Sequence, residues 1–203
     1  MDRAGLYAAL DAFLAALNAG DHTRLAWAKG AHHSENNVML EIGDGVWGTI
    51  QKLGDYQLRF ADTRTGQVGY FGTVIEAIEE SAFTLRLQIN EAGQIAECEM
   101  LIVRQSDSGI KFENCRYWDK PILHREVVAP VPRAEMIALS NGYFDTLQRN
   151  DGTIHTKFHP DCNRVENGVQ TTNNADFPLP IARLGCEAQF ALGWYRYDDE
   201  LRA

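Results

Sequence analysis

Apolar residues near the amino terminus recur with the period of a helix. The positions that share one helical face are Leu6, Leu10, Phe13, Leu14 and Leu17. They predict an amphipathic helix over residues 3–18 that packs on a core. Gly20 follows, and glycine readily adopts the left-handed conformation that ends a helix. Because Asp2 and Asp11 interrupt the apolar residues and no basic segment precedes them, the pattern does not indicate a signal peptide.

Alternation of apolar and polar residues dominates the stretch that follows. Four strands are predicted there, over residues 56–63, 67–77, 81–90 and 94–105. The third is the clearest, because Phe83, Leu85 and Leu87 fall on one face. A short helix near residues 21–29 and a small hairpin over residues 36–47 precede the strands. The pattern therefore predicts an α+β domain in which helices cover one face of a curved antiparallel sheet.

An internal repeat organises the chain. Residues 4–23 align with residues 134–153 at a constant offset. Several matches lie outside the apolar stripe, namely Asp21 and Thr23 with Asp151 and Thr153 and, after a one-residue slip, Glu35-Asn36 with Glu166-Asn167. These matches predict a duplicated unit. Chance similarity between two amphipathic helices is the alternative, because helical periodicity alone produces some matches.

The repeat divides the chain into three segments. We expect a first unit over residues 1–105, an extension and linker over residues 106–133, and a second unit over residues 134–203. Three prolines mark the linker: Pro121, Pro130 and Pro132. The second unit lacks counterparts for three strands of the first, which would leave an open sheet edge. Either it is a fragment or another chain completes its sheet, and we favour the fragment.

Composition narrows the classes of function. The chain has 203 residues and a net charge of −9, which argues against a nucleic-acid-binding surface, since that needs clustered Lys and Arg. The sequence has no run of about 18 apolar residues, so we expect no membrane-spanning helix. Four cysteines are too few for a secreted disulfide scaffold. We interpret them as buried or inert thiols: Cys98, Cys115, Cys162 and Cys186. The sequence thus predicts a cytoplasmic protein.

Three short segments carry a family resemblance: residues 13–21, Ser34-Glu35-Asn36 and residues 90–95. Through them, residues 3–105 resemble the superfamily of nuclear transport factor 2, ketosteroid isomerase and the SnoaL-like polyketide cyclases. Residues 134–203 resemble it more weakly, as in a group of fungal and bacterial proteins with two such units. The resemblance implies a cone in which a curved sheet wraps around the first helix and encloses an apolar pocket. It also implies a homodimer, but it does not specify one function, because this fold carries many.

The resemblance allows a residue-by-residue test of ketosteroid isomerase chemistry. That chemistry uses an Asp base, with a Tyr and a protonated Asp as hydrogen-bond donors to the enolate oxygen. The matching positions here are Phe13 for the Tyr, Asn36 for the base and Leu85 for the second donor. In the second unit Tyr143 restores the phenol, but Asn167 again replaces the base. Because an amide cannot accept the proton, we do not expect this reaction.

Other side chains near the expected pocket can perform acid–base chemistry. His32, His33 and Glu35 lie close together, and a His beside a carboxylate is a plausible general base. We predict His33 and Glu35 as catalytic residues, with Asn36 positioning a carbonyl group. The alternative is a solvated loop in which Glu35 caps local backbone amides.

A metal or cofactor has little support in the sequence. His155, His159, Asp161 and Cys162 are close together but do not have a recognised zinc-binding spacing. The sequence has no phosphate-binding loop and no dinucleotide fingerprint. We therefore expect neither a metal nor a cofactor.

The expected ligand is small and apolar, because aromatic residues are dense in the first unit. The predicted substrate-binding residues are Phe13, Asn36, Trp47, Tyr56 and Leu85, with Tyr143, Glu166 and Asn167 in the second unit. Two functions stay open. One is a cofactor-independent isomerase, cyclase or dehydratase acting on an apolar or polyketide-like substrate. The other is a non-catalytic ligand-binding or dimerisation module, which a filled core would favour.

Overall fold

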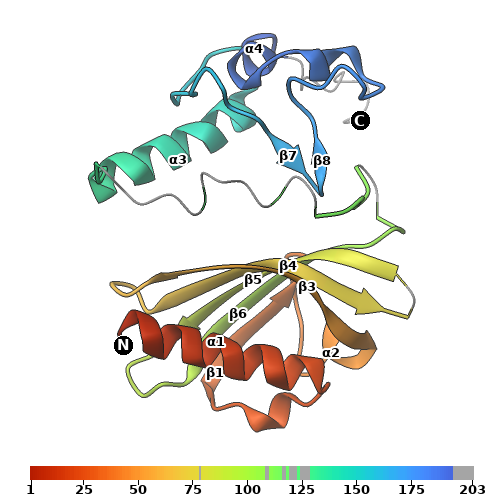
Figure 1. The fold of residues 1–203 in the computed structure, drawn as a ribbon. Helices are drawn as coiled ribbons and strands as arrows, with labels where there is room; N and C mark the ends of the chain where they lie inside the picture. Colours follow the sequence, from red (N-terminus) through yellow and green to blue (C-terminus); the bar gives the residue numbers. More distant parts are fainter. Residues whose placement is uncertain (78, 108–109, 116–117, 119–122, 124–128, 194–203) are drawn as a thin grey trace. The chain divides into compact units, whose positions relative to one another are not determined.

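The chain forms two compact units, Met1–Glu113 and Asn114–Ala203. A computed structural model describes residues 1–77, 79–107, 110–115, 118, 123 and 129–193 (Figure 1). Much of the linker predicted over residues 106–133 therefore lies outside the described residues.

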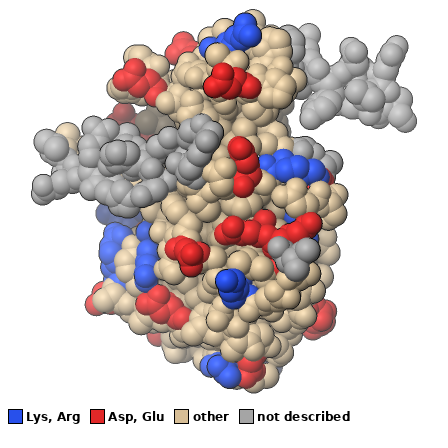
Figure 2. Space-filling view, turned by 45° about the vertical axis from the view of Figure 1, so that its right-hand side comes forward, with Lys and Arg blue, Asp and Glu red and all other residues tan. Residues whose placement is uncertain are grey.

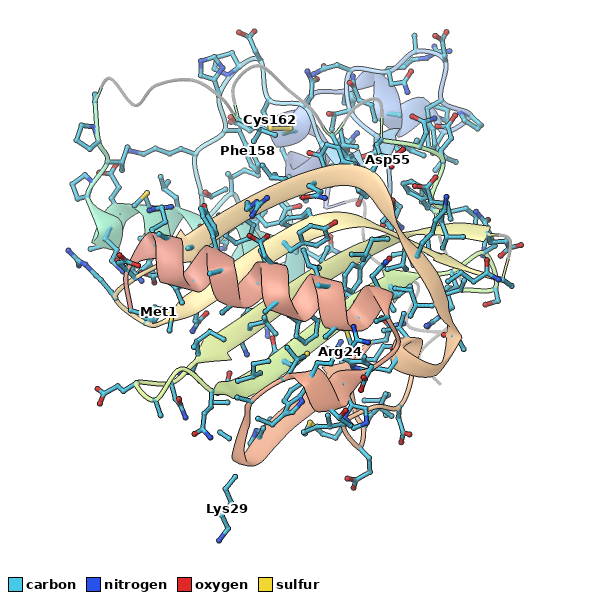
Figure 3. All side chains as sticks on the ribbon, turned by 60° about the horizontal axis from the view of Figure 1, so that its bottom comes forward. Met1, Arg24, Lys29, Asp55, Phe158 and Cys162 are labelled. Carbon is cyan, nitrogen blue, oxygen red and sulfur yellow. A yellow bond between two sulfur atoms is a disulfide. The ribbon has the colours of Figure 1, made fainter. Side chains whose placement is uncertain are left out.

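Helix α1 (Arg3–Asn18) forms as its apolar period predicts. The Asp2 carboxylate accepts a hydrogen bond from the Gly5 N–H at 2.8 Å and so caps the first turn. Its buried positions include Leu6, Leu10, Phe13, Leu14 and Leu17. These side chains pack against one face of a curved sheet, along which α1 lies in Figures 1 and 3. The unit is thus α+β, with the sheet wrapped on the amino-terminal helix.

The sheet has six strands in the order β2-β1-β6-β5-β4-β3. Their bounds are β1 (Trp27–Glu35), β2 (Val38–Met39), β3 (Ile50–Asp62), β4 (Gln67–Glu76), β5 (Glu79–Ile89) and β6 (Ile95–Val103). The last four correspond to the four predicted strands. They pair in antiparallel fashion, as expected for strands joined by short turns.

The segment before β3 differs from the prediction in three ways. The expected helix near residues 21–29 is only a short 3₁₀ turn, η1 (His22–Arg24), followed by β1. The expected hairpin lies earlier and is formed by β1 and β2, while α2 (Val46–Thr49) occupies its second half. Strand β1 pairs in parallel with β6, so the sheet is mixed. The strand order explains this pairing. The connection that contains α2 runs from β2 at one edge of the sheet to β3 at the other edge. The chain then returns strand by strand, so that β6 comes to lie beside β1.

The second unit contains α3 (Arg133–Arg149), β7 (Val165–Glu166), β8 (Val169–Gln170), η3 (Pro180–Arg183) and α4 (Cys186–Ala191). Strands β7 and β8 form a two-stranded antiparallel sheet. Tyr143 and Phe158 pack edge-on and stacked, respectively, against the Phe190 ring. Within the part of the chain that the structure describes, none of the helices is long and apolar enough to cross a membrane.

The interpretation of all four cysteines as thiols is wrong for two of them. Cys162 and Cys186 form a disulfide, visible beside the Cys162 label in Figure 3. The two residues lie 24 positions apart in sequence with a Cα–Cα distance of 5.9 Å. Cysteine count and spacing alone do not reveal such proximity. Cys98 is a buried free thiol, as predicted, and burial raises its pKa.

Candidate functional site

The candidate acid–base residues lie on a strand rather than in a loop. Along β1, His33 pairs with Cys98 and Glu35 pairs with Met100, and the side chains of both partners belong to the core. His33 and Glu35 therefore face the same interior, whereas His32 is exposed on the opposite face. Because successive side chains of a strand point to opposite faces, the two neighbouring histidines have different surroundings.

His33 is buried to 1% exposure, and neither ring nitrogen makes a hydrogen bond of normal geometry among the described residues, although the main chain of Asp44 and of Cys98 lies nearby. Burial lowers the pKa of His33, because desolvation penalises the charged imidazolium. The main chain of Asp44 and of Cys98 and the negative charges of Glu35 and Asp44 favour the imidazolium, but their effect is smaller. A neutral imidazole has one donor and one acceptor, and leaving both unpaired in a core is costly. Such a group calls for an explanation beyond packing.

The His33 imidazole lies at one end of a series of aromatic ring contacts. The ring centroids of Trp27 and His33 lie 6.5 Å apart, those of Phe13 and Trp27 lie 6.3 Å apart, and those of Phe13 and Trp47 lie 5.2 Å apart. We call these four residues the aromatic cluster. The indole N–H of Trp47 is buried and, in the described part of the chain, also has no acceptor. The cluster thus combines apolar rings with unpaired donors and an unpaired acceptor.

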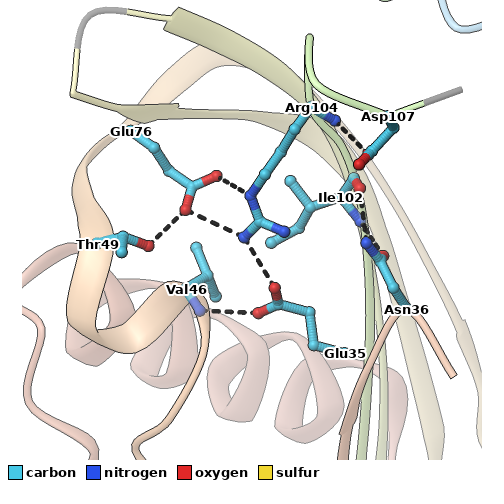
Figure 4. A network of polar contacts seen from close by, with 8 residues as sticks. All are labelled: Glu35, Asn36, Val46, Thr49, Glu76, Ile102, Arg104 and Asp107. Atoms are coloured by element: carbon cyan, nitrogen blue, oxygen red, sulfur yellow. Dashed lines mark hydrogen bonds and ion pairs between the residues drawn. The ribbon is translucent and has the colours of Figure 1, made fainter. Parts of the chain in front are cut away.

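Glu35 is held by two hydrogen bonds, one to each oxygen (Figure 4). Oε1 accepts from the Arg104 guanidinium at 2.8 Å, and Oε2 accepts from the Val46 N–H at 2.7 Å. The second bond satisfies a free N–H at the start of α2, whose own cap residue, Gly45, has no side chain to do so. Gly45 is required here, because its φ is +67° and a Cβ would clash with Oε2 of Glu35. Glu35 therefore fixes α2, and α2 carries Trp47.

Arg104 joins Glu35 to a second carboxylate. Its Nε donates to Glu76 at 2.7 Å, and Thr49 also hydrogen-bonds to Glu76 (Figure 4). Burial raises the pKa of Glu76, but the hydrogen bonds from Arg104 and Thr49 outweigh it and lower the pKa overall. The two carboxylates raise the pKa of Arg104. Glu76 and Arg104 also line a surface hollow of about 440 Å³, so the network borders on solvent.

Asn36 has a structural task in this arrangement. It adopts a left-handed conformation, with φ +49°, in the turn between β1 and β2. Its carboxamide pairs with the main chain of Ile102 in both directions, accepting at 2.8 Å and donating at 3.0 Å. The side chain thus extends the ladder between β1 and β6. This contact explains why an amide, with one donor and one acceptor, suits the position.

The other predicted residues of the first unit divide between interior and edge. Phe13, Trp47 and Leu85 belong to the buried core. Tyr56 is half-buried on β3, and its main-chain oxygen accepts a hydrogen bond from the Tyr70 hydroxyl at 3.3 Å. The structure brings Phe13 and Trp47 into the aromatic cluster with His33.

In the second unit, Tyr143 and Glu166 are linked through intermediate residues. The Tyr143 and Phe190 ring centroids lie 5.5 Å apart, and the Arg164 guanidinium lies over the Phe190 ring. Arg164 also lies 3.5 Å from the half-exposed Glu166 carboxylate. Asn167 occupies the turn between β7 and β8 with φ +50°. Among the described residues, the structure holds no group of three His, Cys, Asp or Glu side chains that could bind a metal.

Sequence reasoning missed Arg104 altogether. It lies 69 positions from Glu35 in the sequence, and only the parallel pairing of β1 with β6 brings the two together. An Arg directly after a buried strand was the available signal, but such residues are common at strand ends. Trp27 was not predicted as a site residue, and its contact with His33 depends on the same unpredicted strand.

Charged side chains are mixed on the molecular surface. Figure 2 shows acidic and basic residues interspersed over the face in view. This distribution, with the net charge of −9, does not point to a polyanion as the partner.

Comparison with known proteins gives limited likenesses. A family model described as "Domain of unknown function (DUF8021)" matches residues 129–203. None of the curated proteins matches the chain. A de novo designed protein with a curved β-sheet is 13% identical, with a TM-score of 0.42, over 50% of this chain and 88% of its own. A SnoaL-like family protein from Agrobacterium tumefaciens strain C58, named as a proposed isomerase, is 13% identical, with a TM-score of 0.35, over 49% of this chain and 97% of its own.

Proposed function

We propose that the first unit is a cofactor-independent small-molecule enzyme of the SnoaL-like type, with an apolar carbonyl compound as its substrate. The observation that carries the proposal is the buried His33 imidazole, whose two nitrogens make no hydrogen bond of normal geometry among the described residues. A substrate with polar atoms would satisfy groups that the protein leaves unpaired. The sequence resemblance to isomerases and cyclases supports the same class.

His33 is the general base in this proposal. Its lowered pKa keeps the imidazole neutral at physiological pH, so one nitrogen can accept a proton. The proton comes from the carbon next to the substrate carbonyl: the C–H bond breaks, an N–H bond forms and an enolate results. The Trp47 indole N–H would donate to the enolate oxygen. In a β,γ-unsaturated substrate the enolate is conjugated with the C=C bond, so return of the proton to the γ carbon shifts the double bond and completes an isomerisation without an oxidant or a cofactor.

Glu35 is a positioning residue in this scheme rather than a second acid–base group. Both of its oxygens already accept hydrogen bonds, from Arg104 and from the Val46 N–H. It acts through α2, which holds the Trp47 ring in the aromatic cluster. Asn36 likewise keeps its two hydrogen bonds to Ile102 and is not used to orient a carbonyl.

The test uses 2-tetralone, a flat apolar ketone with exchangeable protons beside its carbonyl. Exchange of these protons for deuterium in D₂O is followed by NMR with the full chain. His33→Phe should slow the protein-catalysed exchange by at least about 100-fold, the usual contribution of a general base. The matched control is His32→Phe, one position away on the exposed face, which should leave the rate unchanged. Equal rates in the wild type and in a folded His33→Phe variant would refute the enzyme proposal.

The same experiment addresses the non-catalytic alternative, which the many rings that fill the core favour. The NMR signal of the Trp47 indole N–H should shift when 2-tetralone binds in the aromatic cluster. A shift without any protein-catalysed exchange would identify a ligand-binding module and exclude catalysis on this ketone.

Two expectations about the whole protein need separate measurements. The homodimer that the resemblance implies stays a prediction, and sedimentation equilibrium would measure its mass. We propose an oxidising compartment in place of the cytoplasm, because the Cys162–Cys186 disulfide is of a kind rarely kept in reducing cytosol. Protein isolated under acid trapping from its natural host should leave both cysteines unreactive to maleimide until a reductant is added.

A further inference from the structure

The outer face of the six-stranded sheet, opposite α1, carries a groove of about 370 Å³. Strand pairing places its residues in rows across the sheet. One row runs from Phe60 on β3 through Gly69 and Arg86 to Glu99 on β6. The next row runs through Phe71, Thr84 and Leu101. His33 points to the other face, so this groove is separate from the aromatic cluster.

Two phenylalanines form the apolar part of the groove. Phe60 and Phe71 are 50% and 41% exposed, and their ring centroids lie 5.8 Å apart at an angle of 38°. The ring of Phe60 lies directly over Gly69, where a Cβ would clash with it. Glycine at this position therefore lets the ring lie down against the sheet, leaving an aromatic surface open to a flat molecule.

The polar part of the groove has an excess of negative charge. Arg86 donates to Glu97 at 2.6 Å and to Glu99 at 2.8 Å, so its single positive charge is shared between two carboxylates. Asp62 also lines the groove, and its carboxylate accepts hydrogen bonds from the Arg64 N–H and the Thr65 hydroxyl. The hydrogen bond from Arg86 lowers the pKa of Glu99, which therefore stays ionised at neutral pH.

We propose that this groove binds a planar organic cation. Its flat ring would lie against Phe60 and Phe71, where the negative ring faces attract a positive charge. Its charge would be balanced by the excess negative charge of Glu97 and Glu99, which share the single positive charge of Arg86. A planar anion of the same size would meet those carboxylates and bind more weakly.

The exposed apolar area favours a small occupant over a second copy of the chain. Phe60, Phe71 and Leu101 are each about half exposed, so together they offer roughly 300 Å² of side-chain surface. A stable protein interface buries about 800 Å² on each partner. Ion-paired and hydroxyl side chains occupy the rest of the rows, which suits a polar rim around a small ligand.

The probe for the test is berberine, a flat aromatic cation whose fluorescence rises in apolar sites. Its flat anionic counterpart is pyrene-1-sulfonate, which is also fluorescent. Titration of the full chain should show one berberine site and tighter binding of berberine than of the anion. Phe71→Ala should weaken berberine binding at least about fivefold, and Glu99→Gln should weaken it about threefold. Val38→Ala, which shortens an exposed apolar side chain on the other face of the sheet, opposite Glu35 in the β1–β2 pair, should change nothing.

Three results would overturn the proposal. The first is equal or tighter binding of the anion. The second is unchanged berberine binding in Phe71→Ala, whose folding is checked by circular dichroism. The third is a dimer in sedimentation that dissociates in Phe71→Ala and does not bind berberine, since a second copy would then occupy the face. Loss of ketone exchange in His33→Phe with berberine binding intact would show that the two sites are independent.

Discussion

The two β-hairpins share a turn but differ in what surrounds it. Each has a Glu-Asn pair and an Asn in the left-handed conformation, with φ +49° at Asn36 and +50° at Asn167. Each turn has two residues of positive φ, the geometry that suits a tight hairpin. The first hairpin belongs to a six-stranded sheet, whereas the second is a two-stranded sheet. The turn is therefore a local property of the sequence and is not by itself a site.

The neighbours of the turn decide its chemistry. Glu35 is buried and binds Arg104 and the start of α2, whereas Glu166 is half-exposed and lies beside Arg164. The helices differ in the same sense: Leu6 and Leu14 of α1 are buried, while the matching Met136 and Phe144 of α3 are 49% and 66% exposed. A duplicated unit remains a prediction, and the two copies it implies would differ chiefly in their cores.

Truncation of matched helix residues should give the largest contrast. Leu6→Ala removes a fully buried side chain and should lower the free energy of unfolding of the first unit by roughly 2–5 kcal/mol. Met136→Ala should change that of the second unit by less than about 0.5 kcal/mol. Amide hydrogen exchange, measured on peptides from each unit, reports the two separately. A large loss for Met136→Ala would mean that a partner covers α3.

Removal of the matched carboxylates should give a smaller contrast. Glu35→Gln weakens two charged hydrogen bonds and should cost the first unit about 2 kcal/mol. Glu166→Gln should cost the second unit less than about 0.5 kcal/mol, because exposed ion pairs are weak. Exchange of the α2 amides should accelerate only in Glu35→Gln. Equal losses in the two variants would contradict the view that the Glu-Asn turn acquires its importance from its surroundings.

The pH dependence of the first unit should change when His33 is replaced. Its pKa is lowered by folding, so below about pH 6.5 the unfolded chain binds a proton that the folded chain does not. Stability should therefore fall as the pH is lowered from 7 towards 5. His33→Phe should remove this part of the loss, while His32→Phe should retain it. Melting temperatures at pH 5, 6 and 7 test this, and parallel curves for the wild type and His33→Phe would contradict it.

Local patterns predicted the parts of the fold that depend on local sequence. The period of Leu6 to Leu17 predicted α1, and alternation around Phe83 predicted β5 because one face of that strand is buried. Strand β1 was missed because its inward positions include His33 and Glu35, so it lacks an apolar alternation. Its parallel pairing with β6 is a long-range property that no local pattern contains.

The candidate site was predictable to the same extent. Residue chemistry identified His33 and Glu35 as a pair, and the structure places both on one face of β1. It could not identify Arg104, whose contact with Glu35 depends on strand order, or the disulfide, which depends on the packing of α4. The resemblance placed Asn36 at a pocket, but its pairing with Ile102 became visible only in three dimensions.

The smallest expected effect concerns the two turns that follow the matched helices. In each, the Asp carboxylate accepts a hydrogen bond from the N–H of a Thr two positions later, at 3.1 Å for Asp21 and 2.8 Å for Asp151. Hydrogen bonding, to Thr23 in the first turn and to Thr153 in the second, lowers the pKa of each Asp. The contribution of these two Asp carboxylates to stability should be present above about pH 4, and it should be lost as the pH falls below that value. Asp21→Asn and Asp151→Asn should therefore cause small and similar increases in local amide exchange at pH 7. Unequal increases would show that even this shared turn depends on its unit, and equal ones would strengthen the case for a common origin of the two segments.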